Sequence, residues 1–521
     1  MVGIFAIGGK KMEGLSKKIY LELPAPTEED ARSDQIRILD GLKDAGIREK
    51  VYMPVGIIRK LYPLLDQAKW KVTVSLVWNG ENWEIAELEK GNQSSRHYGF
   101  AVDLGSTTVV CRLFDCVSGE ILGEVSCFNR QITWGTDILS RIFYCKDDAK
   151  KLEEVRLATV ASVTECMEKL KKRTGISGEE CLSMVIAGNT TMIHFLLGMD
   201  AFCVFYTPHA VHADCPGFFR GRELDIPIKG NVFIYPAKSN YLGGDIISGM
   251  IDTELYKKEE ISVFFDIGTN GELVIGNKEF LLCGAGAAGP ALEGGVVRTG
   301  MRADQGAVDE VKIENGKIKV HVIQEVAPKG ICGSGIIDLI AELFLEGWID
   351  IRGKLSLEKS SLIMEKEGQL CVEYAPGLYF YQKDIDEFIR TKSAAHTMVE
   401  IMLRESGLAL DQADKFYVAG AFGKHVSKES AITIGMYPDM ARDHIINAGN
   451  SSLEGAGKLL LNRALLKDIQ EILEKMVYIQ FAEVEDFLEL MTAAQAIPHT
   501  DYNRYPTVIE KLRKRQKGVV W

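Results

Sequence analysis

The sequence predicts an α/β fold made of two similar halves, and one pattern that occurs twice is the main reason. The stretches VDLGSTT at 102–108 and FDIGTNGE at 265–272 each follow an apolar run typical of a buried strand. In each stretch an aspartate at the strand end is followed by an apolar residue, a glycine and a hydroxyl residue, and then by another strand-like run. The repeat indicates two copies of one strand–turn–strand hairpin.

The turns of the two hairpins contain the residue types that bind phosphate. Gly105 and Gly268 allow a tight backbone to approach a ligand closely, and successive N–H groups can then hold phosphate oxygens. Asp103 and Asp266 would face the same phosphates, which requires a cation such as Mg²⁺, held directly or through water. One D-x-G-S/T pattern alone is an ordinary Asp–Gly turn, but two copies favour phosphate sites. The other candidate ligands in these turns are Ser106, Thr107, Thr108, Thr269 and Asn270.

Composition excludes several other classes of protein. The 521 residues suffice for three or four domains, and 46% hydrophobic with 26% charged residues is an ordinary soluble balance. A net charge of −12 argues against a nucleic-acid-binding protein. No apolar run reaches 18 residues, so we expect no membrane span, and without a signal-peptide pattern we expect a cytoplasmic protein. The 11 cysteines contain no C-x2-C pair and predict buried thiols.

The chain before the first hairpin predicts a linker and a small domain. Residues 1–30 predict an extended linker, and 31–96 predict a small α/β middle domain. Apolar residues at helical spacing predict helices near 36–42 and 57–65. An Asn-Gly turn at 79–80 between alternating strands is the strongest short hairpin signal.

The first half, 97–255, begins with three consecutive strands and continues with alternating helices and strands. The expected strands are 98–103, 107–115, 121–128, 181–187 and 232–235, and the expected helices are 136–147, 149–174 and 246–255. Asn189, Thr190, Gly244 and Asp245 follow buried strands of this half, where ligands bind in α/β folds. Asn189 and Thr190 either face the cleft at this edge or cap the helix that follows them.

The second half, 256–521, repeats this order. The expected strands are 261–266, 271–275, 279–283, 416–418 and 477–481, with a hairpin at 311–320 and helices at 336–347, 384–407, from 453 and near 483–493. Gly333 and Ser334 begin one helix, where they could bind a phosphate or nucleotide hydroxyl or simply cap the helix. Two halves of this kind are typical of the duplicated actin-like ATPase (ribonuclease H-like) fold.

In proteins of that fold the nucleotide lies between the halves, and a glycine-rich strand end in the second half holds the adenosine. The run VAGAFG at 418–423 has the place of that strand end, so Gly420, Ala421, Phe422 and Gly423 are the expected adenosine loop. Related ATPases place the residue that orients the attacking water where Asp245 begins its helix. An aspartate favoured there by the helix dipole is the alternative explanation.

Several runs, in order along 98–456, resemble the ATP-dependent reductive activators of corrinoid proteins. They are YGFAVDLGSTTVV, WGTDILSRI, VIAGNTTMIHFLLG, YLGGDIISGM, FDIGTNGELVIG, CGAGAAGPALEGG, GICGSGIIDLI, YVAGAFG and GNSSLEGA. SKKIYLELPAPTEEDARSD at 16–34 resembles the same family's linker and the start of its middle domain.

The resemblance implies that ATP with Mg²⁺ drives the one-electron reduction of a partner corrinoid protein from cobalt(II) to cobalt(I). Members of this family commonly take the electron from an N-terminal iron–sulfur domain. This sequence departs from them, because it begins at the linker and shows no cluster-ligand pattern. Either the cluster domain has been removed from this chain, or a separate donor such as a ferredoxin supplies the electron. A homodimer is possible.

Three other functions remain as alternatives. The first is a small-molecule kinase of the same fold, and the second is a nucleotide-dependent assembly factor without redox activity. The third is an activator of 2-hydroxyacyl-CoA dehydratases, which would need Cys283 and Cys332 to hold a cluster at a dimer interface. The spacing of His209, His212, Asp214 and Cys215 also allows zinc, although a surface loop is the better interpretation.

Overall fold

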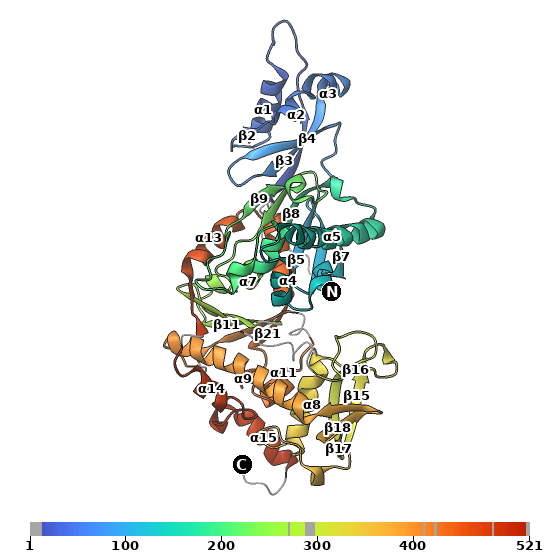
Figure 1. Cartoon of the computed structure of the whole chain (residues 1–521). Coiled ribbons are helices and arrows are strands. Elements are labelled where there is room, and N and C mark those ends of the chain that lie inside the picture. The colour runs from blue at the N-terminus through green and yellow to red at the C-terminus, as the bar shows by residue number, and fades with distance from the viewer. Residues whose placement is uncertain are drawn as a thin grey trace. The chain divides into compact units, whose positions relative to one another are not determined.

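The computed structural model describes residues 13–268, 271–286, 297–409, 412–420, 425–481 and 484–516. The chain divides into two compact units. The first contains residues 1–252 and 451–474, and the second contains 253–450 and 475–521. Each unit is described by itself, and Figure 1 gives the elements their labels.

The first unit begins with a small α/β module. Its sheet has the order β1–β3–β4–β2, with β1 Ser16–Glu22, β2 Val51–Tyr52, β3 Lys71–Trp78 and β4 Trp83–Lys90. Three helices belong to the module, α1 Asp34–Asp44, α2 Val55–Ile58 and α3 Leu61–Gln67. The expected hairpin at 79–80 is confirmed, because β3 and β4 pair in antiparallel register from Val72 to Trp78.

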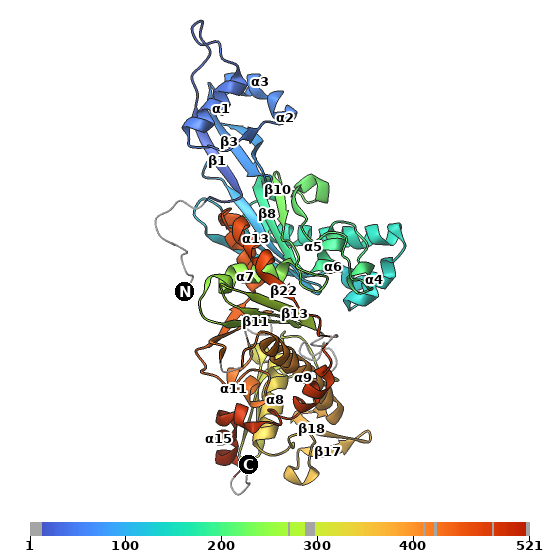
Figure 2. The same cartoon turned by 90° about the vertical axis from the view of Figure 1, so that its left-hand side faces the viewer.

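Strand β1 differs from the expected extended linker. All seven of its residues pair with β3 in antiparallel register, and Figure 2 shows the two strands side by side. Leu21 is buried in the core of the module. The proline-rich composition that suggested a linker begins only at Pro24, after the strand has ended. The small module therefore includes residues that precede position 31.

A six-stranded sheet is the centre of the first unit within the described residues, in the order β7–β6–β5–β8–β10–β9. Its strands are β5 Tyr98–Leu104, β6 Thr108–Asp115, β7 Ile121–Phe128, β8 Cys181–Gly188, β9 Gly217–Arg220 and β10 Asn231–Ile234. Strands β5, β8 and β10 are parallel neighbours, so their carboxyl ends meet at one edge of the sheet. This edge contains most of the residues expected to bind a ligand in the first half.

Helices cover this sheet from segments far apart in the sequence. They are α4 Ile138–Cys145, α5 Ala149–Thr174, α6 Thr190–Leu196, α7 Gly244–Thr253, α12 Ser451–Leu461 and α13 Leu465–Lys475. Figure 2 shows α5 and α6 on one side of β8 and β10, with the orange-red helix α13 on the other. Helix α12 packs on β5 and β8.

The compact units do not follow the expected boundary at 255–256 throughout, because α12 belongs to the first unit. Residues 451–474 belong to the first unit, although everything between 253 and 450 belongs to the second. The apolar side chains of Leu453, Leu459 and Leu460 are buried, and Gly455 lets the helix approach α7 closely. A boundary drawn from sequence order alone cannot show that the chain returns.

The second unit contains a second six-stranded sheet within the described residues, in the order β21–β20–β11–β12–β13–β22. Its strands are β11 Ser262–Ile267, β12 Gly271–Gly276, β13 Leu281–Gly286, β20 Lys415–Ala419, β21 Ile445–Gly449 and β22 Met476–Tyr478. Strands β11, β12 and β13 repeat the meander of β5, β6 and β7, and β20 lies parallel to β11 as β8 lies parallel to β5. The expected duplication is therefore confirmed.

Two smaller sheets and several helices complete the second unit. The sheets contain β14 Ala307–Glu314, β15 Lys317–Val322 and β16 Gly330–Ile331, and β17 Ile363–Lys366, β18 Gln369–Ala375 and β19 Leu378–Tyr381. The helices are α8 Gly333–Leu345, α9 Gln382–Glu405, α11 Lys428–Thr433, α14 Phe487–Ala493 and α15 Pro506–Arg515. Among the described residues, no helix has the length and apolar character that crossing a membrane requires.

Candidate nucleotide-phosphate site

The first hairpin has the geometry that its sequence predicts. Strands β5 and β6 pair in antiparallel register up to Leu104 and Val109, which leaves the turn 105–107 at the carboxyl end of β5. A Cβ atom added to Gly105 would lie 2.5 Å from the carbonyl oxygen of Thr108, so only glycine fits this turn. Ser106, Thr107 and Thr108 are half-buried.

The carbonyl groups of this turn accept hydrogen bonds from two residues, Asn129 and Arg141. The Asn129 side chain donates from Nδ2 to the Gly105 oxygen at 2.9 Å, and its backbone N–H donates to the Thr107 oxygen at 2.9 Å. Arg141 donates from Nη1 to the Ser106 oxygen at 2.6 Å. In the described part of the chain, no protein group accepts a hydrogen bond from the N–H of Ser106 or Thr107. Those N–H groups can therefore bind an anion.

Asp103 lies at the end of β5, beside α12. It is half-buried, and its Oδ1 accepts a hydrogen bond of 2.9 Å from the hydroxyl of Ser452. Ser452 is the second residue of α12. The hydrogen bond from this helix therefore holds the Asp103 carboxylate beside the phosphate turn. Sequence analysis did not identify Ser452, since 349 residues separate it from its partner.

The next strand end contains Asn189 and Thr190. Asn189 caps α6, because its Oδ1 accepts a hydrogen bond of 3.0 Å from the N–H of Met192. The hydroxyl of the buried Thr190 donates to the carbonyl oxygen of Ser239 at 2.8 Å. These contacts are those of a helix cap and a loop anchor, and they occupy the Asn189 oxygen and the Thr190 hydroxyl proton.

Gly244 and Asp245 begin α7 at the same sheet edge. A Cβ atom on Gly244 would lie 2.5 Å from the Cβ of Tyr235, so glycine allows the helix to begin close to the end of β10. Asp245 is half-buried in the first turn, and its Oδ1 accepts a hydrogen bond of 3.0 Å from the N–H of Ile246. The carboxylate is therefore at the positive end of the helix dipole, beside the strand ends.

The second hairpin repeats this arrangement in the second unit. Asp266 pairs with Glu272 across β11 and β12, and Gly268 begins the turn between these strands. Both Asp266 and Gly268 are half-buried. The other expected ligands of this turn, Thr269 and Asn270, lie outside the described residues.

Gly420 lies directly beside Asp266. Strand β20 runs parallel to β11 with Ala419 paired to Asp266, so the expected adenosine loop begins at the second phosphate turn. Gly420 has a φ angle of +87°, and an added Cβ atom would lie 2.8 Å from the Asp266 Oδ1. Both features require glycine. Ala421, Phe422 and Gly423 lie outside the described residues.

Gly333 and Ser334 form the buried start of α8. The Ser334 hydroxyl lies 3.4 Å from the sulfur of Cys332, which itself donates to the Val308 oxygen at 3.4 Å. The serine hydroxyl is thus in contact with a neighbouring thiol inside the fold, and Ser334 is only 7% exposed.

The cysteines do not gather into a cluster site. All eleven are free thiols, and those in the two Gly-rich turns, Cys283 and Cys332, are buried. Burial raises the pKa of the Cys111 thiol and that of the Cys181 thiol, which disfavours the thiolate form that ligates iron. Within the described ranges, no three cysteine sulfurs lie close enough together to bind one metal ion. These residues therefore do not fit an iron–sulfur cluster.

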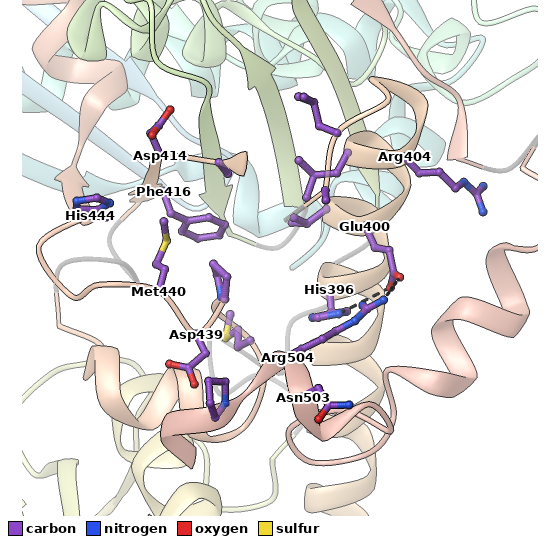
Figure 3. A pocket seen from close by; sticks show the side chains of 18 of the residues that line it. His396, Glu400, Arg404, Asp414, Phe416, Asp439, Met440, His444, Asn503 and Arg504 are labelled. Atoms are coloured by element: carbon purple, nitrogen blue, oxygen red, sulfur yellow. Dashed lines mark hydrogen bonds and ion pairs between the residues drawn. The ribbon is translucent and has the colours of Figure 1, made fainter. Parts of the chain in front are cut away.

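A cavity of about 850 Å³ lies elsewhere in the second unit. Figure 3 shows Phe416 and Met440 on one side of it and His396, Glu400 and Arg504 on the other. Phe416 is near the start of β20, whereas Gly420 follows its end. Since a strand rises about 3.3 Å per residue, the cavity is at the opposite end of this strand from the candidate phosphate turn.

Near this cavity, His396, Glu400 and His499 have potential ligand atoms within 4.8 Å of one another. In the tautomer in which the Nδ1 of His396 donates to the Gly435 carbonyl at 3.2 Å, its Nε2 is an acceptor. The Nδ1 of His499 accepts from the Asp501 N–H at 2.9 Å, so its Nε2 carries the proton of the neutral ring. Two acceptors and one donor suit a water molecule or a ligand hydroxyl rather than a divalent cation.

Three sequence models of one family match consecutive parts of the chain. They are described as the RACo linker region, which matches residues 9–95, the RACo middle region, which matches 98–258, and the C-terminal domain of RACo, the ASKHA domain, which matches 260–509. ASKHA proteins are the actin-like superfamily, so the expected fold is confirmed.

Individual relatives agree with this match. The corrinoid activation enzyme RamQ of Eubacterium limosum is 30% identical over 410 residues, which are 75% of this chain and 69% of the relative. A [Co(II) methylated amine-specific corrinoid protein] reductase of Methanosarcina barkeri is 27% identical over 302 residues, 52% of this chain and 54% of the relative. A solved structure of a reductive activator for corrinoid, iron–sulfur protein has a TM-score of 0.88 and 35% identity, covering 96% of this chain and 82% of that chain.

Proposed function

This chain belongs to the RACo family of reductive activators of corrinoid proteins, and from that premise we propose that it binds and hydrolyses ATP to drive the reduction of a cobalt(II) corrinoid protein to cobalt(I). The observation that carries the proposal is the similarity to RACo along residues 9–509. The names of the matched relatives supply the class of partner.

The phosphates of ATP bind to the two hairpin turns. Support comes from the first turn, where the carbonyls of Gly105, Ser106 and Thr107 are held by other residues and the N–H groups of Ser106 and Thr107 are available. Gly268, Thr269 and Asn270 have the corresponding role in the second turn, by the repeat in the sequence. In phosphoryl transfer, positioning and electrostatic stabilisation do most of the catalytic work.

Asp103 and Asp266 hold Mg²⁺ through its water ligands, each beside its own phosphate turn. Both carboxylates are half-buried at strand ends, and carboxylate oxygens suit this cation. Bound Mg²⁺ would neutralise negative charge on the phosphates. Asp245 orients the attacking water, since its carboxylate lies at the start of α7 at the same sheet edge as the first turn. Gly420 to Gly423 approach the nucleotide from the second turn.

ATP hydrolysis is coupled to the reduction through the affinity of this chain for its corrinoid partner. If the ATP-bound and ADP-bound forms differ in affinity for the cobalt(II) corrinoid protein, hydrolysis can drive an otherwise unfavourable reduction. The electron comes from a donor outside the described residues, because their cysteines do not fit a cluster. A ferredoxin or an iron–sulfur domain is the class of donor that we propose, with a homodimer as the possible assembly.

The three alternatives have less support. The two curated relatives and the solved structure at 35% identity are all named for activating or reducing corrinoid proteins. An activator of 2-hydroxyacyl-CoA dehydratases would need Cys283 and Cys332 at a surface, and both side chains are buried.

Visible absorbance tests the proposal directly. A cobalt(II) corrinoid protein is mixed with this chain and a reductant that cannot complete the reduction alone, with and without Mg-ATP. We expect the cobalt(I) band to rise only with ATP. A band that stays at cobalt(II) while ATP is consumed would refute the coupling to cobalt and leave an ATPase of other purpose.

A variant separates binding from folding in this test. Asp266→Ala should lose ATP-dependent reduction and bind Mg-ATP at least about tenfold more weakly, because a charge-assisted contact contributes about 1.5–3 kcal/mol. Asp309→Ala is the matched control, since Asp309 pairs with the exposed His321 on β14 and β15. Wild-type binding of Mg-ATP by Asp266→Ala would remove Asp266 from the site.

A further inference from the structure

Arg141 is a fully buried arginine behind the first phosphate turn. It lies on α4, within the WGTDILSRI run that the nucleotide site described above does not explain. Its Nη1 donates to the Ser106 oxygen at 2.6 Å and to Gln131 Oε1 at 3.1 Å, and its Nε donates to the Gly135 oxygen at 2.9 Å. A single side chain therefore joins α4 to the centre of the turn.

The other residues of the run place this arginine. Gly135 has a φ angle of +153°, and an added Cβ atom would lie 2.5 Å from the Cβ of Ser140, so glycine is needed where the chain enters α4. Asp137 caps the helix, with Oδ1 accepting from the Ser140 N–H at 2.8 Å and Oδ2 from the Ser140 hydroxyl at 2.6 Å. Both carboxylate oxygens of Asp137 are thus used for the cap rather than for Arg141.

No carboxylate of the described residues forms an ion pair with Arg141, and the exposed Asp137 carboxylate acts on its charge only from beyond salt-bridge distance. Its partners are carbonyl and amide oxygens, its Nη2 is buried without a hydrogen-bond partner, and across the described ranges no carboxylate lies within salt-bridge distance. Burial lowers the pKa of the guanidinium, although the group remains charged at neutral pH. A buried charge without an ion-pair partner is costly. The three N–H groups with which Arg141 and Asn129 hold the carbonyls of the turn explain the position of Arg141 but not its buried charge.

A nucleotide polyphosphate would provide the missing negative charge. Because the carbonyls of the turn are bonded to Asn129 and Arg141, the N–H groups of Ser106 and Thr107 are left for phosphate oxygens, and the guanidinium lies behind them. Charge acts through this low-dielectric layer more strongly than through water. The same arginine thus orients the turn and favours an anion on it.

We propose that Arg141 is the positioning residue of the first phosphate turn, and that its buried charge makes this turn select nucleotides with a β-phosphate over AMP. The inference rests on the proposed function, because it assumes that the turn binds ATP. It assigns a role to α4 and predicts that affinity depends on the charge of a residue that does not touch the nucleotide.

Nucleotide titration calorimetry of two variants tests this role. Arg141→Gln keeps an N–H donor and removes the charge, and Arg141→Lys keeps the charge and loses the planar fork. We expect Arg141→Gln to bind ATP and ADP about 10- to 100-fold more weakly, since the substitution removes the buried positive charge that favours an anion on the turn. AMP, measured by competition, should bind as in the wild type. Arg141→Lys should recover most of the ATP affinity.

A merely structural role gives a different result. In that case both variants would lose affinity for ATP, ADP and AMP by the same factor, and the charge-keeping lysine would give no rescue. Arg156→Gln is the matched control, because the Arg156 guanidinium on α5 is paired with Glu153 and Asp225 and should leave all three affinities unchanged. If Arg141→Gln does not fold, the test uses the ratio of the affinities of Arg141→Lys for ATP and for AMP. Equal affinity of Arg141→Lys for ATP and AMP would overturn the proposal.

The outcomes also separate this inference from the proposed function. Wild-type ATP binding together with unchanged binding by Arg141→Gln overturns only the role of Arg141. A wild-type chain that binds no nucleotide overturns the proposed function and this inference with it.

Discussion

Gly420 combines a backbone requirement with a close contact. Its φ angle of +87° is costly for any other residue, by about 1–2 kcal/mol, and an added methyl group would meet the Asp266 Oδ1 at 2.8 Å. Gly420→Ala should therefore lower stability by about that amount and also weaken Mg-ATP binding, because Asp266 must move. Thermal unfolding and nucleotide titration measure the two effects.

Gly407 is the control for this prediction. It has a φ angle of +72°, but an added Cβ atom meets nothing within 4 Å. Gly407→Ala should show the loss of stability without the loss of nucleotide affinity. Equal ATP binding by Gly420→Ala and the wild type would contradict the prediction.

His97 makes stability depend on pH. The side chain is buried, its Nε2 lies 2.8 Å from the Ser16 hydroxyl, and burial lowers its pKa to about 4, with Lys18 adding to the shift and Asp115 opposing it. Between pH 6.5 and 4 the unfolded chain therefore binds more protons than the folded one, so the free energy of unfolding falls as the pH falls. The loss from this group is at most about 3 kcal/mol.

Urea denaturation at pH 7 and pH 4.5 measures this effect. The midpoint of His97→Gln should depend less on pH than that of the wild type. His321→Gln is a control of opposite sign, because the hydrogen bond that the exposed His321 donates to the Asp309 carboxylate raises the pKa of His321. Its pairing stabilises the fold below pH 6.5 and is lost as the pH rises. Identical pH dependence of His97→Gln and the wild type would rule out His97.

Individual site residues were predictable only where they belong to one short sequence pattern. Asp103 and Asp266 could be identified because each follows an apolar strand and precedes a glycine in the same short pattern. The sequence could not identify Ser452, Asn129 and Arg141, because each contacts the first hairpin from a distant part of the chain. The separations run from 22 positions, between Asn129 and Thr107, to 349 positions, between Ser452 and Asp103. The hydroxyl of Thr190, expected to face a nucleotide, was likewise found in a contact with Ser239 that no pattern announces.

At the scale of elements, the packing of α12 on α7 depends on one glycine. A Cβ atom on Gly455 would lie 1.9 Å from the carbonyl oxygen of Ser248, and the Ser248 hydroxyl already donates to the Ser452 oxygen at 2.7 Å. In an exposed helix Gly→Ala is stabilising by up to about 1 kcal/mol. Here the sign should reverse, and Gly455→Ala should cost about 1–3 kcal/mol through overpacking.

Gly56→Ala in α2 tests the same substitution without the contact. No atom lies within 4 Å of the added Cβ, so this variant should be slightly more stable than the wild type. Thermal unfolding of both variants is the measurement. Stabilisation by Gly455→Ala as well would show that α7 and α12 are packed less closely than described.

Most elements with strong periodicity or clear turns were predictable, and those without them were missed. The β3–β4 hairpin has an Asn-Gly turn and the β14–β15 hairpin has Asn315 and Gly316, both with positive φ angles. The sheet of β17, β18 and β19 escaped prediction, because its first turn uses Glu367 with Gly368 in the same conformation. Glutamate is an uncommon residue at a turn position with a positive φ angle, and strands β17 to β19 are short.

At the scale of the whole molecule, the chain leaves the first unit after residue 252 and returns to it at 451. Sequence order favoured a single boundary between two consecutive halves, because each half begins with its own hairpin. The return is caused by tertiary packing of the apolar face of α12 on β5 and β8. An amphipathic helix carries no signal in its own sequence that tells which of two similar sheets it covers.

The first unit should therefore fold only when it receives the returning segment. A fragment of residues 13–252 leaves uncovered the sheet face that buries Leu453, Leu459 and Leu460. Each of these leucines contributes about 1.5–3 kcal/mol when fully buried, and their sum is comparable to the total stability of a domain. We expect the fragment to be aggregated or without cooperative unfolding, and the same fragment fused through a flexible linker to residues 451–474 to unfold cooperatively.

Near-ultraviolet circular dichroism and thermal unfolding compare the two proteins. A matched fusion with Leu453, Leu459 and Leu460 replaced by serine controls for the added length and should behave as the bare fragment does. Cooperative unfolding of residues 13–252 alone would mean that α12 covers the sheet without being required for it, and the single boundary drawn from the sequence would then be adequate for making a separate first unit.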